Sequence, residues 1–456
     1  MEALMIGVSG MRGTVGGTLT PPVVARMAAA LAVWLGRSSS NRPLKVVLGR
    51  DTRPSGPWVR DAAAASLVAS GVRLIDLEVA TTPGVAMMVA HLGADAGVVI
   101  TASHNPIQWN GLKFLDRRGV APPARVAEEI RRLYDLHAAD FARVESLVPP
   151  ERNTQTHALH VKRVLDHVDE LGISTRRFKV VLDSVNGAGC VPTHTLLSKL
   201  GCQIVHLNGT PDGRFAHEPE PTEANLRGLA DEVRRQRADV GFAQDPDADR
   251  LAVVDETGRY IGEEYSLALA ARLVLARKPG GVAVANLSTS RMLDDIAAAH
   301  GGRVVRSAVG EANVVQTMLE HNAVIGGEGN GGVIDPRIVL GRDSLVGMAY
   351  VLQLMTELKK PLSSIVADIP AYRIVKTKFE CRREDADRAV AALREAFAAE
   401  RIDLQDGIRI DWPDAWVHAR ASNTEPIMRI IAEAPTEESA RSRIEAVRAV
   451  VDRALK

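Results

Sequence analysis

The residue types most able to perform chemistry include a hydroxyl, an imidazole and an amide that follow one another at the end of an apolar stretch. They lie in residues 101–106 (Thr-Ala-Ser-His-Asn-Pro), after a predicted buried strand at 98–101. Because Pro106 opposes an ordinary helix, the loop would present Ser103 as a nucleophile at a strand end. A serine hydrolase would place its serine in a Gly-x-Ser-x-Gly elbow, and no such elbow surrounds Ser103. Acyl transfer is therefore disfavoured, while an ordinary turn remains the alternative for this loop taken alone.

A second loop carries three carboxylates at alternate positions, Asp245, Asp247 and Asp249, between two apolar stretches. In an extended loop these side chains would lie on one side and repel one another unless a cation lay between them. Mg²⁺ prefers such oxygen ligands and can keep a coordination position for a phosphate oxygen. An EF-hand is excluded because Arg250 stands where its loop requires glycine. The sequence therefore predicts a magnesium site, with a solvated acidic turn as the alternative.

Two further loops carry groups suited to a sugar phosphate. The glycine-rich residues 326–332 include Glu328 and Asn330, which could bind sugar hydroxyls where the glycines permit close backbone approach. Residues 420–426 (Arg-Ala-Ser-Asn-Thr-Glu-Pro), followed by Arg429, gather a guanidinium, hydroxyls, an amide and backbone N–H groups that could hold a phosphate. Taken alone, the first loop is equally typical of a Gly-rich hairpin and the second of a capped turn.

Predicted strands and helices alternate along most of the chain, which indicates α/β architecture. Among the predicted helices are residues 21–36, 58–70, 83–92, 157–171 and 264–277, and among the predicted strands are 44–48, 72–79, 179–182, 203–207, 240–244, 251–254 and 282–285. Beyond residue 370 the order changes to strand 372–379, helix 384–399, strands near 407–411, 416–420 and 428–433, and helix 436–455. The domains we predict are three α/β domains over 1–150, 151–255 and 256–368, and an α+β domain over 369–456. They carry, in order, the serine, acidic, glycine-rich and phosphate loops.

The amino-acid composition does not indicate any particular binding partner. The 456 residues carry 56 basic and 56 acidic side chains, so no overall field attracts nucleic acid or an anionic membrane. The most apolar early stretch is interrupted by Arg26 and is too short to span a bilayer. The three cysteines show no CxxC spacing and the first residues do not resemble a signal peptide, so we expect a cytoplasmic protein. Its oligomeric state is expected to be monomer or homodimer.

Together and in this order, the four loops resemble those of the α-D-phosphohexomutase family. The resemblance spans nearly the whole chain and also includes residues 7–13 (Gly-Val-Ser-Gly-Met-Arg-Gly), 49–53 (Gly-Arg-Asp-Thr-Arg) and 110–113 (Asn-Gly-Leu-Lys). The pairing of Thr-Ala-Ser-His-Asn-Pro with Asp-x-Asp-x-Asp-Arg is highly specific. It implies four domains around a central cleft, three of them α/β with mixed sheets and the last similar in layout to TATA-binding protein.

The resemblance also implies roles for individual residues. Ser103 would carry the phosphoryl group and, through that phosphate, complete the Mg²⁺ site of Asp245, Asp247 and Asp249. Arg12, His104 and Lys113 match positions close to the phosphoserine, and His104 or Lys113 would be the acid/base. Substrate contacts are implied for Arg250, Glu328, Asn330, Arg420, Ser422, Asn423, Thr424 and Arg429.

The implied activity interconverts hexose 6-phosphate and hexose 1-phosphate through a hexose 1,6-bisphosphate, which also serves as activator. Asn330 departs from the Gly-Glu-x-Ser pattern of many family members, and Ala312 stands where bacterial glucosamine enzymes usually have a basic residue. Thr424-Glu425-Pro426 differs from the Thr-Thr-Pro that is typical of the mannose and glucose enzymes. We therefore expect glucosamine phosphate, with mannose or glucose phosphate as the alternative. A non-catalytic phosphosugar-binding protein and a seryl-phosphate phosphatase are two further hypotheses.

Overall fold

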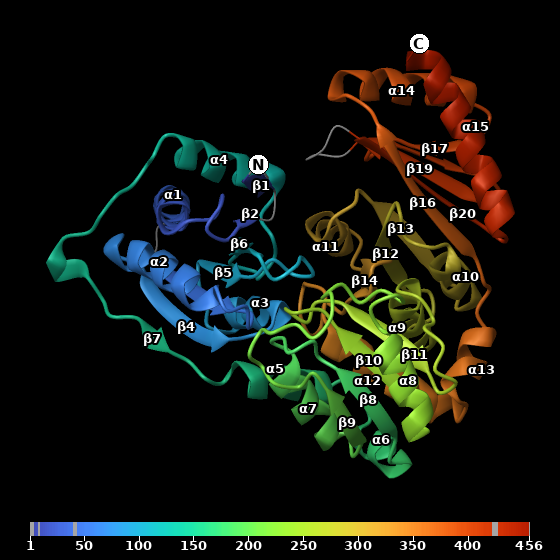
Figure 1. Cartoon of the computed structure of the whole chain (residues 1–456), viewed down its shortest axis with the longest axis horizontal. Helices are drawn as coiled ribbons and strands as arrows, with labels where there is room; N and C mark the ends of the chain where they lie inside the picture. Colours follow the sequence, from blue (N-terminus) through green and yellow to red (C-terminus); the bar gives the residue numbers. More distant parts are fainter. Residues whose placement is uncertain (1–3, 8–9, 40–42, 422–426, 456) are drawn as a thin grey trace. The chain divides into compact units, whose positions relative to one another are not determined.

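The computed structural model describes the chain except for residues 1–3, 8–9, 40–42, 422–426 and 456 (Figure 1). The chain packs into two compact units. The first comprises Met1–Leu273 and Asn330–Val366, and the second comprises Val274–Gly329 and Ala367–Lys456. The chain therefore crosses from one unit to the other at three points.

The first sheet combines parallel strands with an antiparallel edge. Its order is β1 (Met5–Gly7), β2 (Gly10–Thr14), β6 (Trp109–Asp116), β5 (Ala96–Ile100), β3 (Lys45–Arg50), β4 (Arg73–Val79) and β7 (Glu151–Arg152). β3 lies parallel between β4 and β5, whereas β6 runs antiparallel to β5 and to β2. Val46, Val47 and Leu48 of β3 are all fully buried, as expected of a strand covered on both faces.

Helices cover both faces of this sheet. α1 (Pro21–Ser38), α2 (Gly56–Ala69) and α4 (Ala124–Asp135) share one core with the strands, and α3 (Thr82–His91) packs against β3 and β5. Prolines open α1, α2 and α3 within their first two positions, where a missing N–H costs no helical hydrogen bond. A short 3-10 helix, η1 (Val144–Ser146), follows α4.

The second sheet holds the acidic loop between two neighbouring strands. Its order is β11 (Leu251–Asp255), β10 (Val240–Gln244), β8 (Lys179–Asp183) and β9 (Gln203–Leu207). β8 lies parallel to β9 and β10, and β11 returns antiparallel to β10. The helices of this region are α5 (Thr156–Leu165), α6 (Glu170–Arg176), α7 (Cys190–Lys199) and α8 (Arg227–Gln236).

The prediction of one helix over residues 157–171 was wrong. α5 ends at Leu165, and a separate helix, α6, starts at Glu170. Asp169 caps the new helix, because its carboxylate accepts the N–H of Gly172 at 2.9 Å. A carboxylate that satisfies a free helical N–H group competes with continuation of the first helix.

The first unit also contains the chain segment that follows the glycine-rich loop. It includes β15 (Gly332–Ile334) and α12 (Ser344–Leu358), and it ends within α13 (Leu362–Ala367). Every residue of α12 from Ser344 to Met355 is buried, which explains its continuous apolar sequence. α9 (Glu264–Arg277) starts in the first unit and ends in the second.

The second unit contains an α/β region and an antiparallel sheet. In the α/β region β12 (Val282–Asn286) lies parallel between β13 (Arg303–Ser307) and β14 (Ile325–Glu328), with α10 (Met292–Ala299) and α11 (Glu311–Glu320). The antiparallel sheet has the order β16 (Arg373–Glu380), β20 (Ile427–Ala434), β19 (Trp416–Ala421), β18 (Ile408–Asp411) and β17 (Arg401–Asp403). α14 (Arg383–Ala396) and α15 (Glu437–Leu455) pack on this sheet and share its core (Figure 1).

Three α/β regions followed by an α+β layer confirm the predicted fold class. Within the described part of the chain, no helix combines the length and the apolar character needed to span a bilayer.

Candidate functional site

The loop between β5 and β6 holds Ser103 in a strained and buried position. The side chain is 1% exposed, and its backbone lies in the left-handed region with φ +51°. Such a conformation costs a non-glycine residue about 1 kcal/mol or more. The Ser103 N–H donates to Oγ1 of Thr101 at 2.8 Å. Surrounding contacts must therefore hold the loop in this shape.

The Ser103 hydroxyl faces the acidic loop that follows β10. Its Oγ donates to Oδ2 of Asp245 at 2.8 Å and lies 3.3 Å from Nδ1 of His104. Both loops belong to the first unit. The two motifs that carry the chemistry, 142 residues apart in sequence, are therefore in direct contact.

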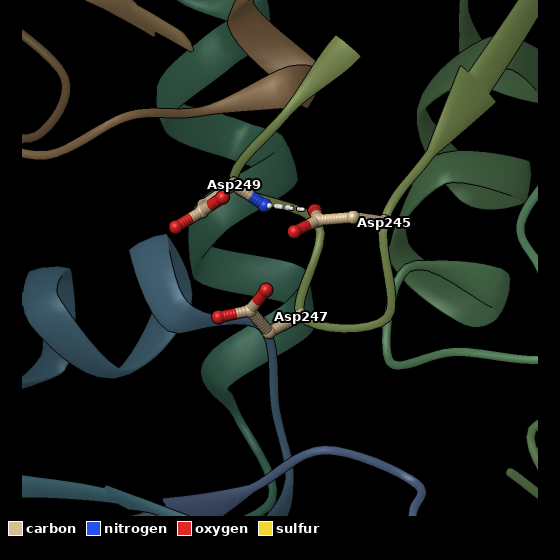
Figure 2. A group of neighbouring side chains, drawn as sticks. All are labelled: Asp245, Asp247 and Asp249. Carbon is tan, nitrogen blue, oxygen red and sulfur yellow. Dashed lines mark hydrogen bonds between the residues drawn. The ribbon is translucent and has the colours of Figure 1, made fainter. Parts of the chain in front are cut away.

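The three aspartates are fully buried and their carboxylates converge. One oxygen from each lies within 4.8 Å of the others, and Figure 2 shows the three side chains around a common space. The loop is a tight turn instead of the extended segment that we expected, because Ala248 adopts φ +57° and Oδ1 of Asp245 accepts the N–H groups of Asp249 and Arg250 at 3.1 Å. Convergence thus comes from the turn.

The oxygens of Asp247 and Asp249 divide into two kinds. Oδ2 of Asp247 accepts from Lys113 at 2.7 Å and from Thr82 at 2.6 Å. Oδ2 of Asp249 accepts from Arg342 at 2.7 Å and from Lys113 at 3.4 Å. The Oδ1 atoms of both are buried and accept no hydrogen bond from any described residue.

These two buried oxygens, which accept no hydrogen bond from the described residues, fit a metal ion. A buried carboxylate oxygen without a partner is costly, and a hard cation removes that cost. Asp247 and Asp249 would each supply Oδ1, while Oδ2 stays with the protein's own donors. Asp245 would supply Oδ2 once Ser103 no longer donates to it. The donor set is all oxygen, as Mg²⁺ requires.

The surroundings shift the pKa values of the three carboxyls in different directions, up for Asp245 and down for Asp247 and Asp249. Burial, reinforced by Asp247 and Asp249, raises the pKa of Asp245 well above its ordinary value. Burial also acts to raise the pKa of Asp247 and Asp249, but Lys113 overcomes it at Asp247 and Arg342 at Asp249, so both pKa values fall below the ordinary value. The latter two carboxyls are therefore ionised and ready to bind a cation at neutral pH.

Cationic and imidazole groups surround Ser103. Burial acts to lower the pKa of Lys113, but Asp247 and Asp249 raise it overall, so the amine carries a proton. Arg12, on β2, donates to Oδ1 of Asn105 at 3.1 Å. Burial, with Arg250 and Arg12, lowers the pKa of His104 from 6.5 to about 3, so this imidazole is neutral.

Replacement of Lys113 with methionine is expected to destabilise the metal-free protein by about 3 kcal/mol, because two buried carboxylates lose their shared cation. Mg²⁺ should then stabilise the variant more than the wild type, since the ion restores positive charge at the same carboxylates. The measurement is urea unfolding in EDTA and in Mg²⁺. The matched control is Lys162→Met, which breaks the exposed Lys162–Asp166 pair. Equal stability of Lys113→Met and wild type in EDTA would contradict this assignment.

The remaining predicted substrate residues fall in both units. In the first unit, Arg250 lies 3.6 Å from a carboxylate oxygen of Glu220, and Asn330 has a buried Oδ1 that accepts no hydrogen bond from the described residues. In the second unit, Oε1 of Glu328, at the end of β14, accepts from Asn286 at 2.8 Å and from the N–H of Gly310 at 3.1 Å.

The predicted phosphate loop is described only in part. Arg420, at the end of β19, forms an ion pair with Asp406 at 3.0 Å, and Arg429 lies opposite it in β20. Ser422, Asn423 and Thr424 lie outside the described residues. Their predicted roles stay predictions.

Sequence reasoning assigned no role to three residues that shape the centre, namely Thr82, Arg342 and Arg53, although Arg53 lies in the 49–53 motif of the family resemblance. Thr82 opens α3 and Arg342 precedes α12, so each contacts the acidic loop from the start of a helix. Arg53 is fully buried beneath the serine loop. A helix start signal was visible at Thr82-Pro83, but nothing local indicated what these side chains would contact.

Comparisons with known proteins give the family. Models described as phosphoglucomutase/phosphomannomutase match in four consecutive parts: α/β/α domain I at residues 3–139, α/β/α domain II at 158–258, α/β/α domain III at 262–372 and the C-terminal domain at 377–450. The chain therefore belongs to the phosphoglucomutase/phosphomannomutase family, whose members are isomerases that move phosphate within sugar phosphates.

The names of individual relatives support this family assignment. A phosphoglucomutase/phosphomannomutase of Thermococcus kodakarensis is 39% identical and covers 99% of both chains. A protein of Methanopyrus kandleri named "probable phosphoglucosamine mutase" is 39% identical and covers 95% of both. The crystal structure of a phosphoglucomutase/phosphomannomutase family protein from Burkholderia thailandensis is 26% identical, with a TM-score of 0.87 over 98% of this chain and 97% of that one.

Proposed function

We propose that the protein interconverts a hexose 6-phosphate and a hexose 1-phosphate, with Ser103 as the phosphoryl carrier. The observation that carries this proposal is the buried Ser103 hydroxyl bonded to Asp245 within a cluster of three carboxylates. A nucleophile next to a cation-binding cluster suits phosphoryl transfer, in which charge on the transferred group must be neutralised. The Arg12 and Lys113 side chains add positive charge at the same place.

Mg²⁺ is the metal that we assign to Asp245, Asp247 and Asp249, and it would neutralise charge on the transferring phosphoryl group. The resident cations have a separate role. Lys113 and Arg342 bind the Oδ2 atoms of Asp247 and Asp249, which leaves the two Oδ1 atoms without a hydrogen bond from the described residues and so available to the metal. Thr82 adds a third donor to this arrangement.

The reaction would proceed in two phosphoryl transfers. In the first, the free hydroxyl of a hexose 6-phosphate attacks the phosphorus of phospho-Ser103, the P–O bond to Ser103 breaks, and the sugar becomes a 1,6-bisphosphate. The hydroxyl proton passes to a protein base, and the leaving Ser103 oxygen takes up a proton. After the sugar turns round, the Ser103 hydroxyl attacks the phosphorus of the 6-phosphate and gives its proton to a protein base. The bond between that phosphorus and the sugar 6-oxygen breaks, the 6-oxygen takes up a proton, and the hexose 1-phosphate is released.

His104 is the better candidate for the acid/base by position, because its Nδ1 lies 3.3 Å from Ser103 Oγ. Lys113 is better suited to electrostatic support, since its amine is bound to two carboxylates. Glu328 and Asn330 would bind sugar hydroxyls. Arg250 would contact the substrate. The unreactive phosphate would be held by Arg420, Ser422, Asn423, Thr424 and Arg429.

Glucosamine phosphate is the substrate that we propose. Seven relatives that are 33–39% identical to this chain are named "probable phosphoglucosamine mutase". Mannose or glucose phosphate is the second candidate, because a relative that is 39% identical is named phosphoglucomutase/phosphomannomutase. Both candidates use the same phosphoryl-transfer centre.

The experiment is a substrate comparison with Ser103 phosphorylated beforehand by a hexose 1,6-bisphosphate. Glucosamine 6-phosphate, mannose 6-phosphate and glucose 6-phosphate are offered separately with Mg²⁺, and kcat/KM for each 1-phosphate is measured. The highest value is expected for glucosamine 6-phosphate. A preference for mannose or glucose would change the substrate only. Release of inorganic phosphate without isomerisation would favour a phosphatase, and binding without turnover would favour a phosphosugar-binding protein.

A further inference from the structure

Arg53 lies fully buried beneath the serine loop, and every N–H group of its guanidinium donates a hydrogen bond. Its Nε bonds to Oδ2 of Asp51 at 3.1 Å. Its two terminal nitrogens donate to four backbone carbonyls, three in the serine loop (Ser103 at 2.7 Å, Asn105 at 2.6 Å and Pro106 at 2.8 Å) and one at the start of β6 (Trp109 at 3.0 Å). The serine loop and the start of the strand that follows it thus converge on one side chain.

A closed ring of hydrogen bonds surrounds the Ser103 backbone. The N–H of Ser103 donates to Oγ1 of Thr101, and the Thr101 hydroxyl donates to Oδ2 of Asp51 at 2.7 Å. Asp51 bonds to Arg53, and Arg53 returns to the carbonyl of Ser103. Both ends of the residue with φ +51° are therefore fixed through one buried ion pair.

The ring is also supported from the side. The guanidinium of Arg53 lies 5.0 Å from the ring centroid of Phe215. The N–H of Arg53 donates to Oδ1 of Asp51 at 2.9 Å, which fixes the turn that carries both charges. All of these residues belong to the first unit.

We infer that Arg53 is a positioning residue that holds Ser103 in its reactive conformation while the serine alternately carries and releases the phosphoryl group. This inference rests on the proposed function. A phosphate on Ser103 brings about two negative charges at neutral pH, and these pull the loop toward neighbouring cations. A loop and strand start held by four carbonyl contacts resist that pull, so Oγ keeps its alignment in both half-reactions. Misplacement by about 1 Å costs such a reaction about 100-fold.

The test compares Arg53→Lys with Thr101→Val, and Arg60→Lys is the matched control. Lysine keeps a charge opposite Asp51 but lacks the planar fork that reaches four carbonyls. Valine removes the Thr101 hydroxyl from the ring and leaves both charges in place. Arg60 is partly exposed and pairs with Asp61 and Asp76, outside the ring. Thermal unfolding and circular dichroism establish which variants are folded.

Three measurements separate positioning from a general structural role. The first gives kcat and KM for the preferred hexose phosphate, and the second uses intact mass to follow the single-turnover rate of Ser103 phosphorylation by hexose 1,6-bisphosphate. The third is the Mg²⁺ affinity from calorimetry. For Arg53→Lys we expect kcat and the phosphorylation rate to fall together by about 100-fold. KM and the Mg²⁺ affinity should remain at wild-type values. Thr101→Val should lower kcat by about tenfold, and Arg60→Lys should behave as wild type.

A folded Arg53→Lys variant with wild-type kcat would overturn the inference, as would a parallel loss of kcat and Mg²⁺ affinity. If Arg53→Lys does not fold, Thr101→Val decides by the same criteria. The wild type is assayed beside the variants. If it isomerises no hexose phosphate, the proposed function fails, whereas an active wild type with an unaffected variant refutes only the role of Arg53.

Discussion

Ser103→Ala is expected to lower the mutase rate by roughly 10⁴-fold or more, which is the scale of loss when a catalytic nucleophile is removed. The physical reason is that no other described hydroxyl donates to the acidic cluster from the same loop, so the phosphoryl group has no carrier. The fold should persist, because a single hydroxyl is lost and the ring around the Ser103 backbone uses only main-chain atoms of this residue. The measurement is conversion of the preferred hexose 6-phosphate, together with intact mass after incubation with hexose 1,6-bisphosphate.

The matched control is Ser70→Ala, which removes a hydroxyl that donates to the carbonyl of Ser66 at the end of α2. It should show wild-type turnover and should gain one phosphoryl group. The Ser103→Ala variant should gain none. Phosphorylation of folded Ser103→Ala at another residue, with turnover retained, would refute Ser103 as the carrier.

Asp247→Asn is expected to weaken Mg²⁺ binding by about 100-fold, since the variant loses one charged ligand from a set of three. The mutase rate should fall in proportion, because charge on the transferring group is no longer neutralised. The thermal stabilisation that Mg²⁺ gives to the wild type should disappear in this variant. Calorimetry and thermal unfolding with and without EDTA measure both effects.

The control is Asp166→Asn, in which the substituted carboxylate is about half exposed and pairs with Lys162. Its Mg²⁺ affinity and its response to EDTA should equal those of the wild type. An Asp247→Asn protein that binds Mg²⁺ normally would show that the cluster is not the metal site. An unchanged rate in EDTA for the wild type would show that the reaction needs no metal.

The chemistry could be predicted because its residues stand in contiguous loops. Ser103 with His104, and the three alternating aspartates, are visible within six residues each, and the apolar stretches on either side predict the strands that present them. Their direct contact depends on two sheets that lie far apart in sequence. The family resemblance predicted it, whereas local pattern could not.

Three kinds of structural feature could not be predicted from the sequence. Contacts made by Thr82, Arg342 and Arg53 depend on tertiary packing, since each is separated from its partners by many residues. Strands β2 and β6 were not predicted either. Both contain glycine and polar residues, so apolar and polar residues do not alternate along them in the regular way that predicts a strand. The break between α5 and α6 depended on one capping carboxylate. The exact domain boundaries stay a prediction.

The distribution of the counter-charges along the chain has a consequence for synthesis on the ribosome. Lys113 precedes Asp247 by 134 residues, and Arg342 follows Asp249 by 93 residues. A nascent chain that has emerged only as far as the acidic loop carries Lys113 but lacks the Arg342 guanidinium that donates to Oδ2 of Asp249. Chains that stop before Arg342 would leave that buried oxygen without this cation, so the completed centre can form only late in translation, and truncated products should be prone to degradation.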